Sequence, residues 1–294
     1  MFIEKIGRRA VGMAIAALFL LVPGSSADAQ TTATQKALES VKESVHTLVG
    51  AKDENNPNED AFRTETFKKV VEFSIVEAKE LKIKFIQSFS EPQSSTTLSL
   101  WRDGILSRTN ELISYYETEL KNLDEIASQK NSEELVREAA EKFRIQRENL
   151  FIPLSEEVSD FLLSEQQKES VSIAEKRWMK IRNDVTKLGK SFSARKMQPL
   201  ESALAKSDAM IGEAEAIRDE IQALFREKYL SAFEEEETVA TTSPEMPEES
   251  SATTTPSNPP RPSIRDLAGE SLLKIKGAYQ IFIEMSGLVR KLFM

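Results

Sequence analysis

The sequence predicts an all-α protein: an elongated helical bundle of antiparallel hairpins, then a disordered linker and a separate amphipathic helix at the C-terminus. Apolar residues recur at spacings of three and four over most of residues 33–233, which is the period of a helix with one buried face. No segment alternates apolar and polar residues between turns, as a half-buried strand would. Because the spacing varies, and Glu and Lys fill the remaining positions, a bundle or hairpins are favoured over a strict coiled-coil rod.

Composition excludes several classes of protein. The 294 residues carry a formal net charge of −9 at pH 7, with one His, no Cys and ten Gly. Without Cys there is no disulfide scaffold, thiolate metal site, Cys nucleophile or lipid anchor on Cys. Few glycines leave little material for phosphate-binding loops. The negative charge, and the lack of a basic segment with interleaved aromatic residues, disfavour nucleic-acid binding.

Residues 1–29 have the pattern of a Sec signal peptide. A basic start, an apolar run and a cleavage site with small residues are formed by Lys5, Arg8 and Arg9, by residues 11–22, and by Ala27 and Ala29. We expect cleavage after Ala29, before Gln30. An uncleaved anchor is the alternative, but twelve apolar residues give a helix of about 18 Å, shorter than the hydrocarbon core of about 30 Å. The predicted location is therefore periplasmic, extracellular or on the cell surface.

Residues 30–233 are expected to form the helical bundle domain. Its first helix ends near Gly50, before a polar turn, and Asn58 is a candidate N-cap for the next helix. Because short connections between long helices favour antiparallel neighbours, the helices over residues 58–89 and 98–130 are predicted to form a hairpin.

Proline and capping residues predict where the second half of the bundle is interrupted. Capping-box spacing at residues 131–134 restarts the chain. Pro153 must kink or restart the next helix, because proline lacks an N–H group and its ring clashes with the preceding turn. A further break is expected near Pro199, and the last core helix is expected to follow it.

Residues 234–263 have the composition of a disordered, acidic linker. They contain six of the eleven prolines, with seven Glu and one Arg for a net charge of −6, and the rest is mainly Ser and Thr. Such a segment buries too little apolar surface to offset the entropy of ordering, so we expect a flexible, partly extended chain.

Residues 264–294 are predicted to form a final amphipathic helix, started by the capping pair Ser263 and Asp266. Charged residues along the helix argue against a transmembrane span. Candidate contact residues for a partner or a membrane lie in its apolar half: Tyr279, Phe282, Ile283, Leu288, Val289 and Leu292. Three alternatives stay open: the helix docks on its own bundle, on another protein, or on an anionic membrane surface.

Patterns that resemble catalytic or metal-binding motifs are incomplete. Residues 189–191 match the end of a phosphate-binding loop, but Asp184 stands where its first glycine is required. Glu43 and His46 have the spacing of a di-iron ligand pair, but His46 is the only His in the chain. We therefore predict no catalytic residue, no cofactor, no metal site and no enzymatic activity.

Four large aromatic residues are further candidate contacts: Trp101, Tyr115, Tyr116 and Trp178. At helical spacing such residues usually belong to a core. Because Tyr115 and Tyr116 are adjacent, they point about 100° apart on a helix, and one of them is expected to face outward.

These observations predict an exported, non-enzymatic interaction or structural protein of the bacterial cell envelope. It would bind an unknown protein partner, or itself, through helix surfaces and the tethered C-terminal helix. One alternative is a ligand-sensing or weakly enzymatic bundle with a carboxylate-lined cleft. Another is a self-assembling or membrane-surface protein that acts through residues 264–294.

Overall fold

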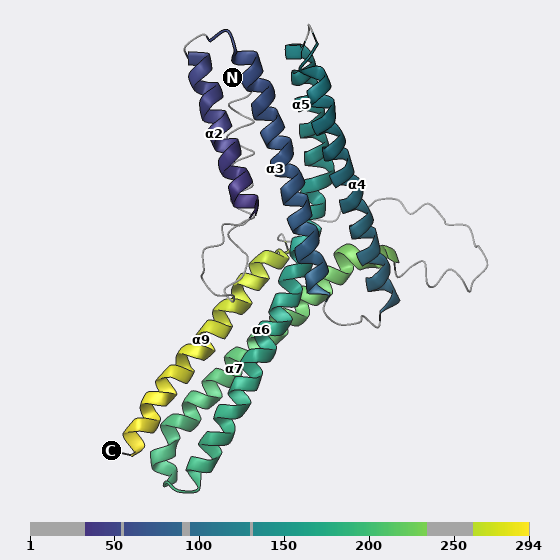
Figure 1. Ribbon diagram of the computed structural model, residues 1–294. Helices are drawn as coiled ribbons and strands as arrows, with labels where there is room; N and C mark the ends of the chain where they lie inside the picture. The colour runs from purple at the N-terminus through teal and green to yellow at the C-terminus, as the bar shows by residue number, and fades with distance from the viewer. Residues whose placement is uncertain (1–32, 54–55, 90–94, 130–131, 234–260, 294) are drawn as a thin grey trace, which may run out of the picture. The chain divides into compact units, whose positions relative to one another are not determined.

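The protein is all-α, as predicted, in every part of the chain that the structure describes (Figure 1). The computed structural model describes residues 33–53, 56–89, 95–129, 132–233 and 261–293. No β-strand occurs in these ranges, and none of their helices is both long and apolar enough to cross a membrane. The predicted signal peptide, with Ala27, Ala29 and Gln30, lies outside the described residues, as does nearly all of the predicted linker.

The described helices fall into two compact units. In chain order the elements are α2 (Ala33–Asp53), α3 (Glu59–Ser88), α4 (Thr96–Ile126), α5 (Ser132–Gln146), the π-helical turn η1 (Arg147–Phe151), α6 (Ile152–Gly189), α7 (Ala194–Phe225), the π-helical turn η2 (Arg226–Leu230) and α9 (Ile264–Leu292). The first unit comprises Met1–Ile83 and Ser107–Ile152, and the second comprises Lys84–Leu106 and Pro153–Met294. Residues 30–233, expected as one bundle domain, are thus divided between the two units, and α9 belongs to the second.

Local capping signals explain where two of the helices begin. Helix α3 starts at Glu59, directly after the expected N-cap Asn58, and has acidic residues in its first turn, where the helix dipole favours them. At the start of α9 the Asp266 N–H donates to Ser263 Oγ (3.1 Å), and the Ser263 N–H donates to Asp266 Oδ2 (3.3 Å). The predicted capping pair is therefore confirmed.

The break expected near Pro199 is wrong. Helix α7 passes through Pro199, and the chain turns earlier, at residues 190–193 between α6 and α7. Pro199 lies close to the start of α7, so its missing N–H removes only the bond to the carbonyl of Arg195. Pro153 is the second residue of α6 and follows η1 without a break in the helix. The hydrogen-bond spacing changes at this π-helical turn, which accommodates the missing N–H of the proline.

In the first unit, α2 and α5 pack against residues of α3 and α4. Leu38 and Val41 of α2 meet Phe73 of α3. Phe143 of α5 lies edge-on to Phe67 of α3 and tilted against Tyr116 of α4. Polar contacts join α3 to α4 in antiparallel order, between Lys68 and Asp124, Lys79 and Glu117, and Lys82 and Asn110.

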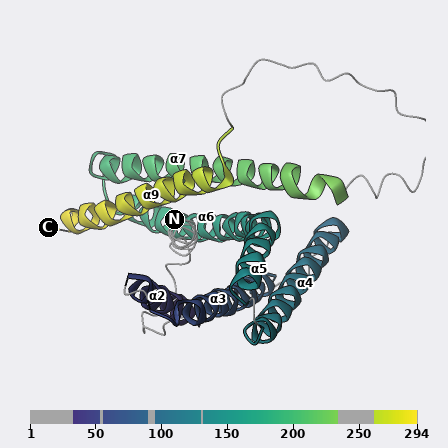
Figure 2. The same ribbon diagram turned by 90° about the horizontal axis from the view of Figure 1, so that it is seen from above.

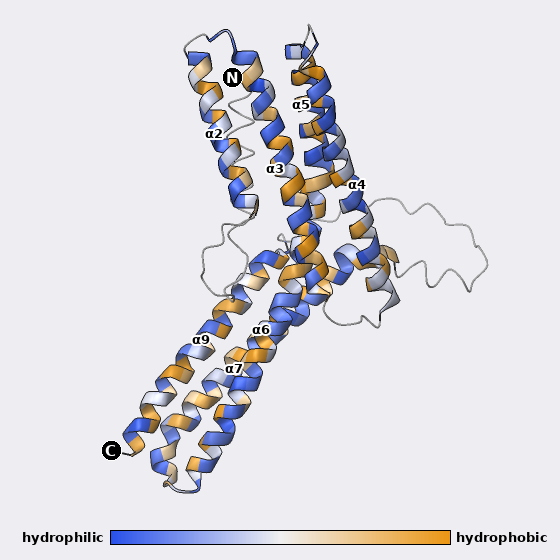
Figure 3. Cartoon of the chain, in the orientation of Figure 1, coloured by the Kyte–Doolittle hydropathy of each residue, from blue (hydrophilic) through white to orange (hydrophobic). Residues whose placement is uncertain are grey.

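In the second unit, α6, α7 and α9 lie side by side (Figures 1 and 2). Helices α6 and α7 form an antiparallel hairpin, and α9 runs antiparallel to α7 along it. Apolar residues recur between polar ones along all three helices (Figure 3). Each helix thus offers one apolar side, and the three sides meet in a shared core.

Candidate interaction site

The core between α6, α7 and α9 follows heptad spacing, with Arg218 of α7 at one inward position and Leu267 of α9 buried outside the pattern. On α9 the inward residues alternate at spacings of three and four: Ile264, Ala268, Ser271, Ile275, Ala278, Phe282, Met285, Val289 and Leu292. Inward residues have the same spacing from Ser164 to Phe192, beginning on α6, and from Met197 to Phe225 on α7. Helix α9 is therefore the third helix of a bundle with coiled-coil spacing.

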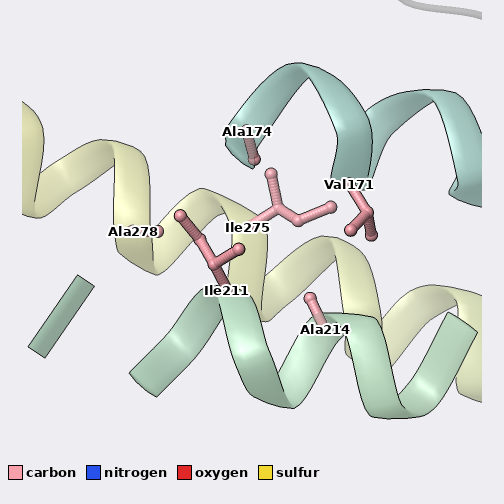
Figure 4. Packing of buried hydrophobic residues seen from close by; sticks show 6 residues of the cluster. All are labelled: Val171, Ala174, Ile211, Ala214, Ile275 and Ala278. Atoms are coloured by element: carbon pink, nitrogen blue, oxygen red, sulfur yellow. The ribbon is translucent and has the colours of Figure 1, made fainter. Parts of the chain in front are cut away.

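Two apolar clusters hold α9 on the α6–α7 hairpin. The first is made by pairs of residues from each helix, which point toward one another in Figure 4: Val171, Ala174, Ile211, Ala214, Ile275 and Ala278. Its three alanines allow the helices to approach closely. The second contains larger side chains: Val185, Met197, Leu200 and Met285. The end of α9 is also fixed by Phe293, whose ring lies edge-on to Phe192 at 5.3 Å.

Most of the candidate contact residues of α9 face this core. Tyr279 and Phe282 pack against the first cluster, and Phe282, Leu288, Val289 and Leu292 pack against the second. Ile283 is the exception, with 65% of its surface exposed. Of the three alternatives for the C-terminal helix, the structure therefore has the one in which it docks on its own bundle.

A polar layer, formed by Gln167 of α6 and Ser271 of α9, interrupts the apolar core near the start of α9. Both residues are fully buried. Gln167 Nε2 donates to the carbonyl oxygen of Ala268 (3.3 Å), but Gln167 Oε1 and Ser271 Oγ have no hydrogen-bond partner among the described residues. A buried polar atom without a partner costs about 1–3 kcal/mol. The polar layer therefore lowers the free energy gained when α9 docks.

Two contacts between α9 and α7 define how far along α7 the helix α9 lies. Lys274 Nζ lies 2.6 Å from Glu213 Oε2, and this hydrogen bond raises the pKa of Lys274. One turn further along α9, a Cβ added at Gly277 would lie 2.8 Å from the Sδ of Met210. Only glycine permits this approach without a shift of the methionine.

A hollow of about 500 Å³ opens beside the first turn of α9, between α6, α7, η2 and residues 261–265. Three acidic and three basic side chains are among its lining residues. Most pair with one another: Arg261 Nη1 with Glu227 Oε1 (2.9 Å) and Lys228 Nζ with Asp160 Oδ2 (3.1 Å). Tyr229 OH also donates to Asp160 (2.7 Å), and burial raises the pKa of this phenol. The first pair connects the segment before α9 to η2, the contacts of Asp160 connect η2 to α6, and together they leave the hollow little net charge.

The aromatic candidates are mostly part of the two cores. Trp101 is fully buried, and its Nε1 donates to Glu157 Oε1 (2.6 Å). Tyr116 is fully buried, whereas its neighbour Tyr115 is half-buried, so the two adjacent rings differ as their angular separation requires. Trp178 is half-buried against the first cluster of the α9 site.

The first unit contains an ion pair that the sequence analysis missed. Arg147 of η1 places Nη2 at 2.5 Å from Glu77 Oε2 of α3, and its Nη1 donates to Ser74 Oγ (3.0 Å). The guanidinium also lies over the ring of Phe151. Burial raises the pKa of Glu77, although Arg147 opposes this. Arg147 and Glu77 are 70 residues apart, so nothing in the local sequence signals their contact.

The incomplete motifs have ordinary structural positions. His46 is exposed on α2, and residues 189–191 are the end of α6 and the turn that follows it. Among the residues that the structure describes, no three His, Cys, Asp or Glu side chains are grouped so that they could hold a metal ion.

No family model, curated protein or solved structure matches the chain. The candidate site is therefore defined by geometry alone. It is the interface between α9 and the α6–α7 hairpin, with the polar layer near one end and the cluster of larger side chains near the other.

Proposed function

We propose that the protein is a non-catalytic interaction protein that is exported through Sec and binds a partner protein with its C-terminal helix. Between binding events, α9 is held on the α6–α7 hairpin. The observation that supports this most directly is the attachment of α9. Arg261, three residues before α9 begins, pairs with Glu227 of η2, yet a long stretch of sequence separates the two.

The connection to α9 is much longer than its ends require. Arg261 and Glu227 are 34 positions apart in sequence, while their side chains lie 2.9 Å apart. Helix connections in bundles usually take about 2–8 residues. A flexible chain of about 30 residues, which the composition of this segment predicts, has an end-to-end distance of roughly 30 Å. The spare length would let α9 leave the hairpin and reach a partner while it stays tethered.

The strength of docking also fits a reversible contact. The apolar clusters favour docking, but the unpaired atoms of Gln167 and Ser271 oppose it. The ion pair between Arg261 and Glu227 is more than half exposed on both sides, and such surface pairs contribute only about 0–1 kcal/mol. Released α9 would expose an apolar face on a basic helix, which suits the groove of an acidic partner.

Export is supported by the sequence of residues 1–29, with its basic start, apolar run and small residues at the cleavage site. The partner would then be met in the periplasm, outside the cell or on the cell surface. A chain without Cys is unaffected by the oxidising conditions of these compartments.

Hydrogen exchange with a covalent lock on α9 tests this function. Glu213→Cys and Lys274→Cys, joined by a bis-maleimide, would fix α9 to α7 through the only two thiols in the chain. Without the lock, the amides of α9 should exchange faster than those of α6 and α7, and the lock should remove this difference. The control is the Glu213→Cys chain treated with the same reagent. Equal exchange in all three helices of the unlocked chain would show instead that α9 is a permanently docked helix of the bundle.

Vesicles of anionic phospholipid distinguish a protein partner from a membrane. They are mixed with the locked and the unlocked chain and then sedimented. A protein-binding α9 leaves both chains in the supernatant. Sedimentation of the unlocked chain alone would reassign α9 to a lipid surface.

A further inference from the structure

We infer that residues 268–277 of α9 determine which helix the α6–α7 hairpin accepts and in which register. The inference rests on the proposed function, because it concerns the same interface. Four residues at a constant spacing of three carry it: Ala268, Ser271, Lys274 and Gly277. The helix that fits the hairpin therefore has the pattern Ala-x-x-Ser-x-x-Lys-x-x-Gly on an apolar heptad.

Register has to be encoded in the interface itself. A long connection before Arg261 does not dictate how far along the hairpin α9 lies. The heptad spacing does not dictate it either, because a shift by seven residues again places inward positions against inward positions. Features that occur once along α9 are needed to select one alignment.

The polar layer is the first such feature. Gln167 donates to the carbonyl of Ala268, and it lies in the core with Ser271. After a shift by seven residues, Ile275 would take the place of Ala268, or Ile264 that of Ser271. The first shift also brings Ala278 to the place of Ser271, so that Gln167 faces a wholly apolar surface. The second brings Arg261 to the place of Ala268, and in both shifts Gln167 loses the serine in its layer. Buried polar residues in coiled coils set register in this way, at a cost in stability.

Lys274 and Gly277 are the second and third features, and both face α7. In shifted registers Glu213 would meet Leu267 or Ile281 instead of Lys274. Met210 would meet Glu270 or Glu284 instead of Gly277, and a Cβ at this place lies 2.8 Å from Met210 Sδ, so the flexible end of the methionine would have to move. Each mismatch disfavours a shifted helix, so the features act together as discrimination against wrong partners.

This pattern describes the partner chemistry of the hairpin. A competing helix needs small residues at the level of Gln167, a cation opposite Glu213 and a glycine opposite Met210. The α9 of a second copy meets all three requirements. An amphipathic helix that has only the apolar heptad does not.

Disulfide trapping reads the register in the full chain. Phe192→Cys with Phe293→Cys places two thiols at positions whose rings are in contact in the observed register, and the last residues of α9 have to close the gap that the removed rings leave before the disulfide forms. Phe192→Cys with Ser286→Cys reports a shift of seven residues, about 10 Å along the helix, which is beyond disulfide reach in the observed register. Both chains are refolded from denaturant under oxidising conditions, so that the register of α9 is established during docking and the disulfide records it.

In the otherwise unchanged chain, only the first pair should form a disulfide. With Gln167→Met and Ser271→Ala added, the ratio of the first disulfide to the second should fall about tenfold or more, because the unique polar layer is gone. Circular dichroism checks that both chains fold. The matched control is Ser207→Ala, since Ser207 is equally buried but donates to Leu204 within its own helix (2.8 Å).

Charge exchange provides a second variant that leaves the core intact. Lys274→Glu should lower the ratio of the first disulfide to the second, and Glu213→Lys added to it should restore the original ratio. An unchanged ratio in both the polar-layer variant and Lys274→Glu would overturn the inference. That outcome is independent of whether α9 is released in the folded chain, which the exchange experiment measures separately.

Discussion

The two compact units bury polar side chains in different ways. In the first, Arg147 and Glu77 form a charged pair with only 19% and 18% of their side chains exposed, and Ser74 accepts a further hydrogen bond. In the second, Gln167 and Ser271 are neutral, completely buried and only partly paired. Breaking a buried charged pair costs far more than breaking a neutral contact. Loss of the Arg147–Glu77 pair should therefore cost the first unit more than loss of the polar layer costs the second.

The apolar residues at two places in the molecule also differ, although packed rings are not confined to the first unit: Phe85, Trp101 and Phe161 of the second unit pack against one another as well. Around Phe143 of the first unit, large rings from three helices meet at irregular spacing. Around Ile275 of the second, three alanines and a regular heptad produce a narrow core. A regular core is one that another helix of the same pattern can enter, whereas an irregular aromatic core accepts only its own side chains.

The largest effect is expected from Arg147→Met. It leaves Glu77 as an unpaired buried carboxylate, so the first unit should lose about 3–5 kcal/mol of unfolding free energy. Urea unfolding followed by far-UV circular dichroism measures this loss. Tryptophan fluorescence isolates the second unit, because Trp101 and Trp178 both belong to it, and its transition should be unchanged.

The double variant Arg147→Met, Glu77→Met is the control for that loss. It removes both charges and should recover most of the stability, to within about 1 kcal/mol of the natural chain. If the single variant is no less stable than the double, the pair does not stabilise the first unit, and the contrast with the polar layer fails.

The second prediction concerns the apolar part of the α9 interface. Ile275→Ala removes a buried side chain between three helices and should cost about 2–4 kcal/mol in the second unit. Trp178 fluorescence in a Trp101→Phe chain measures the effect, because Trp178 packs against the same cluster. Ile283→Ala is the matched control: Ile283 is on the same helix but 65% exposed, so its loss should change stability by less than about 0.5 kcal/mol. Equal losses would contradict the described docking of α9.

Features with local signals were predictable from the sequence. The all-α class follows from periodicity, and the start of α9 follows from Ser263 and Asp266, which are three residues apart and cap each other. Helix docking was not predictable, because one apolar stripe suits a bundle, a protein groove or a membrane equally well. Only the tertiary contacts of Ile275 and Met285 distinguish among these.

The heptad of α6, α7 and α9 and the Arg147–Glu77 pair were not predictable, because polar residues occupy core positions there. Gln167, Ser207 and Ser271 are inward positions of the heptad, yet in sequence they read as gaps in an apolar pattern. The apolar spacing in the sequence therefore varied where the inward positions of the structure follow a heptad. Arg147 and Glu77 were similarly hidden, because charged residues at helical spacing usually lie on solvated faces.

The third prediction is a pH dependence with opposite signs in the two units. Burial raises the pKa of Glu77 above its ordinary value of 4.5, so the folded chain binds this proton more tightly than the unfolded chain. The stability of the natural chain relative to Glu77→Gln should therefore fall as pH rises from 4.5 to the raised folded value, and stay constant outside that window. Urea unfolding of both chains over a pH series measures the difference.

Asp266 of α9 provides the opposite case. Hydrogen bonds from Ser263 lower its pKa below 3.8. The stability of the natural chain relative to Asp266→Asn should therefore be constant above pH 3.8 and fall as the pH drops through the lowered folded value. Slopes of the same sign for Glu77 and Asp266 would show that burial does not dominate the environment of Glu77.

The smallest expected effect is the difference in stability gained by replacing each of two glycines on α9 with alanine. A Cβ at Gly287 meets no atom within 4 Å, so Gly287→Ala should stabilise α9 by about 0.5–1 kcal/mol through helix propensity alone. Gly277→Ala gains the same propensity, but its Cβ would lie 2.8 Å from Met210 Sδ, so the methionine must move and part of the gain is lost. Trp178 fluorescence during urea unfolding compares the two variants. Equal gains would mean that Met210 does not use the space at Gly277, and this glycine would then have no part in selecting the register of α9.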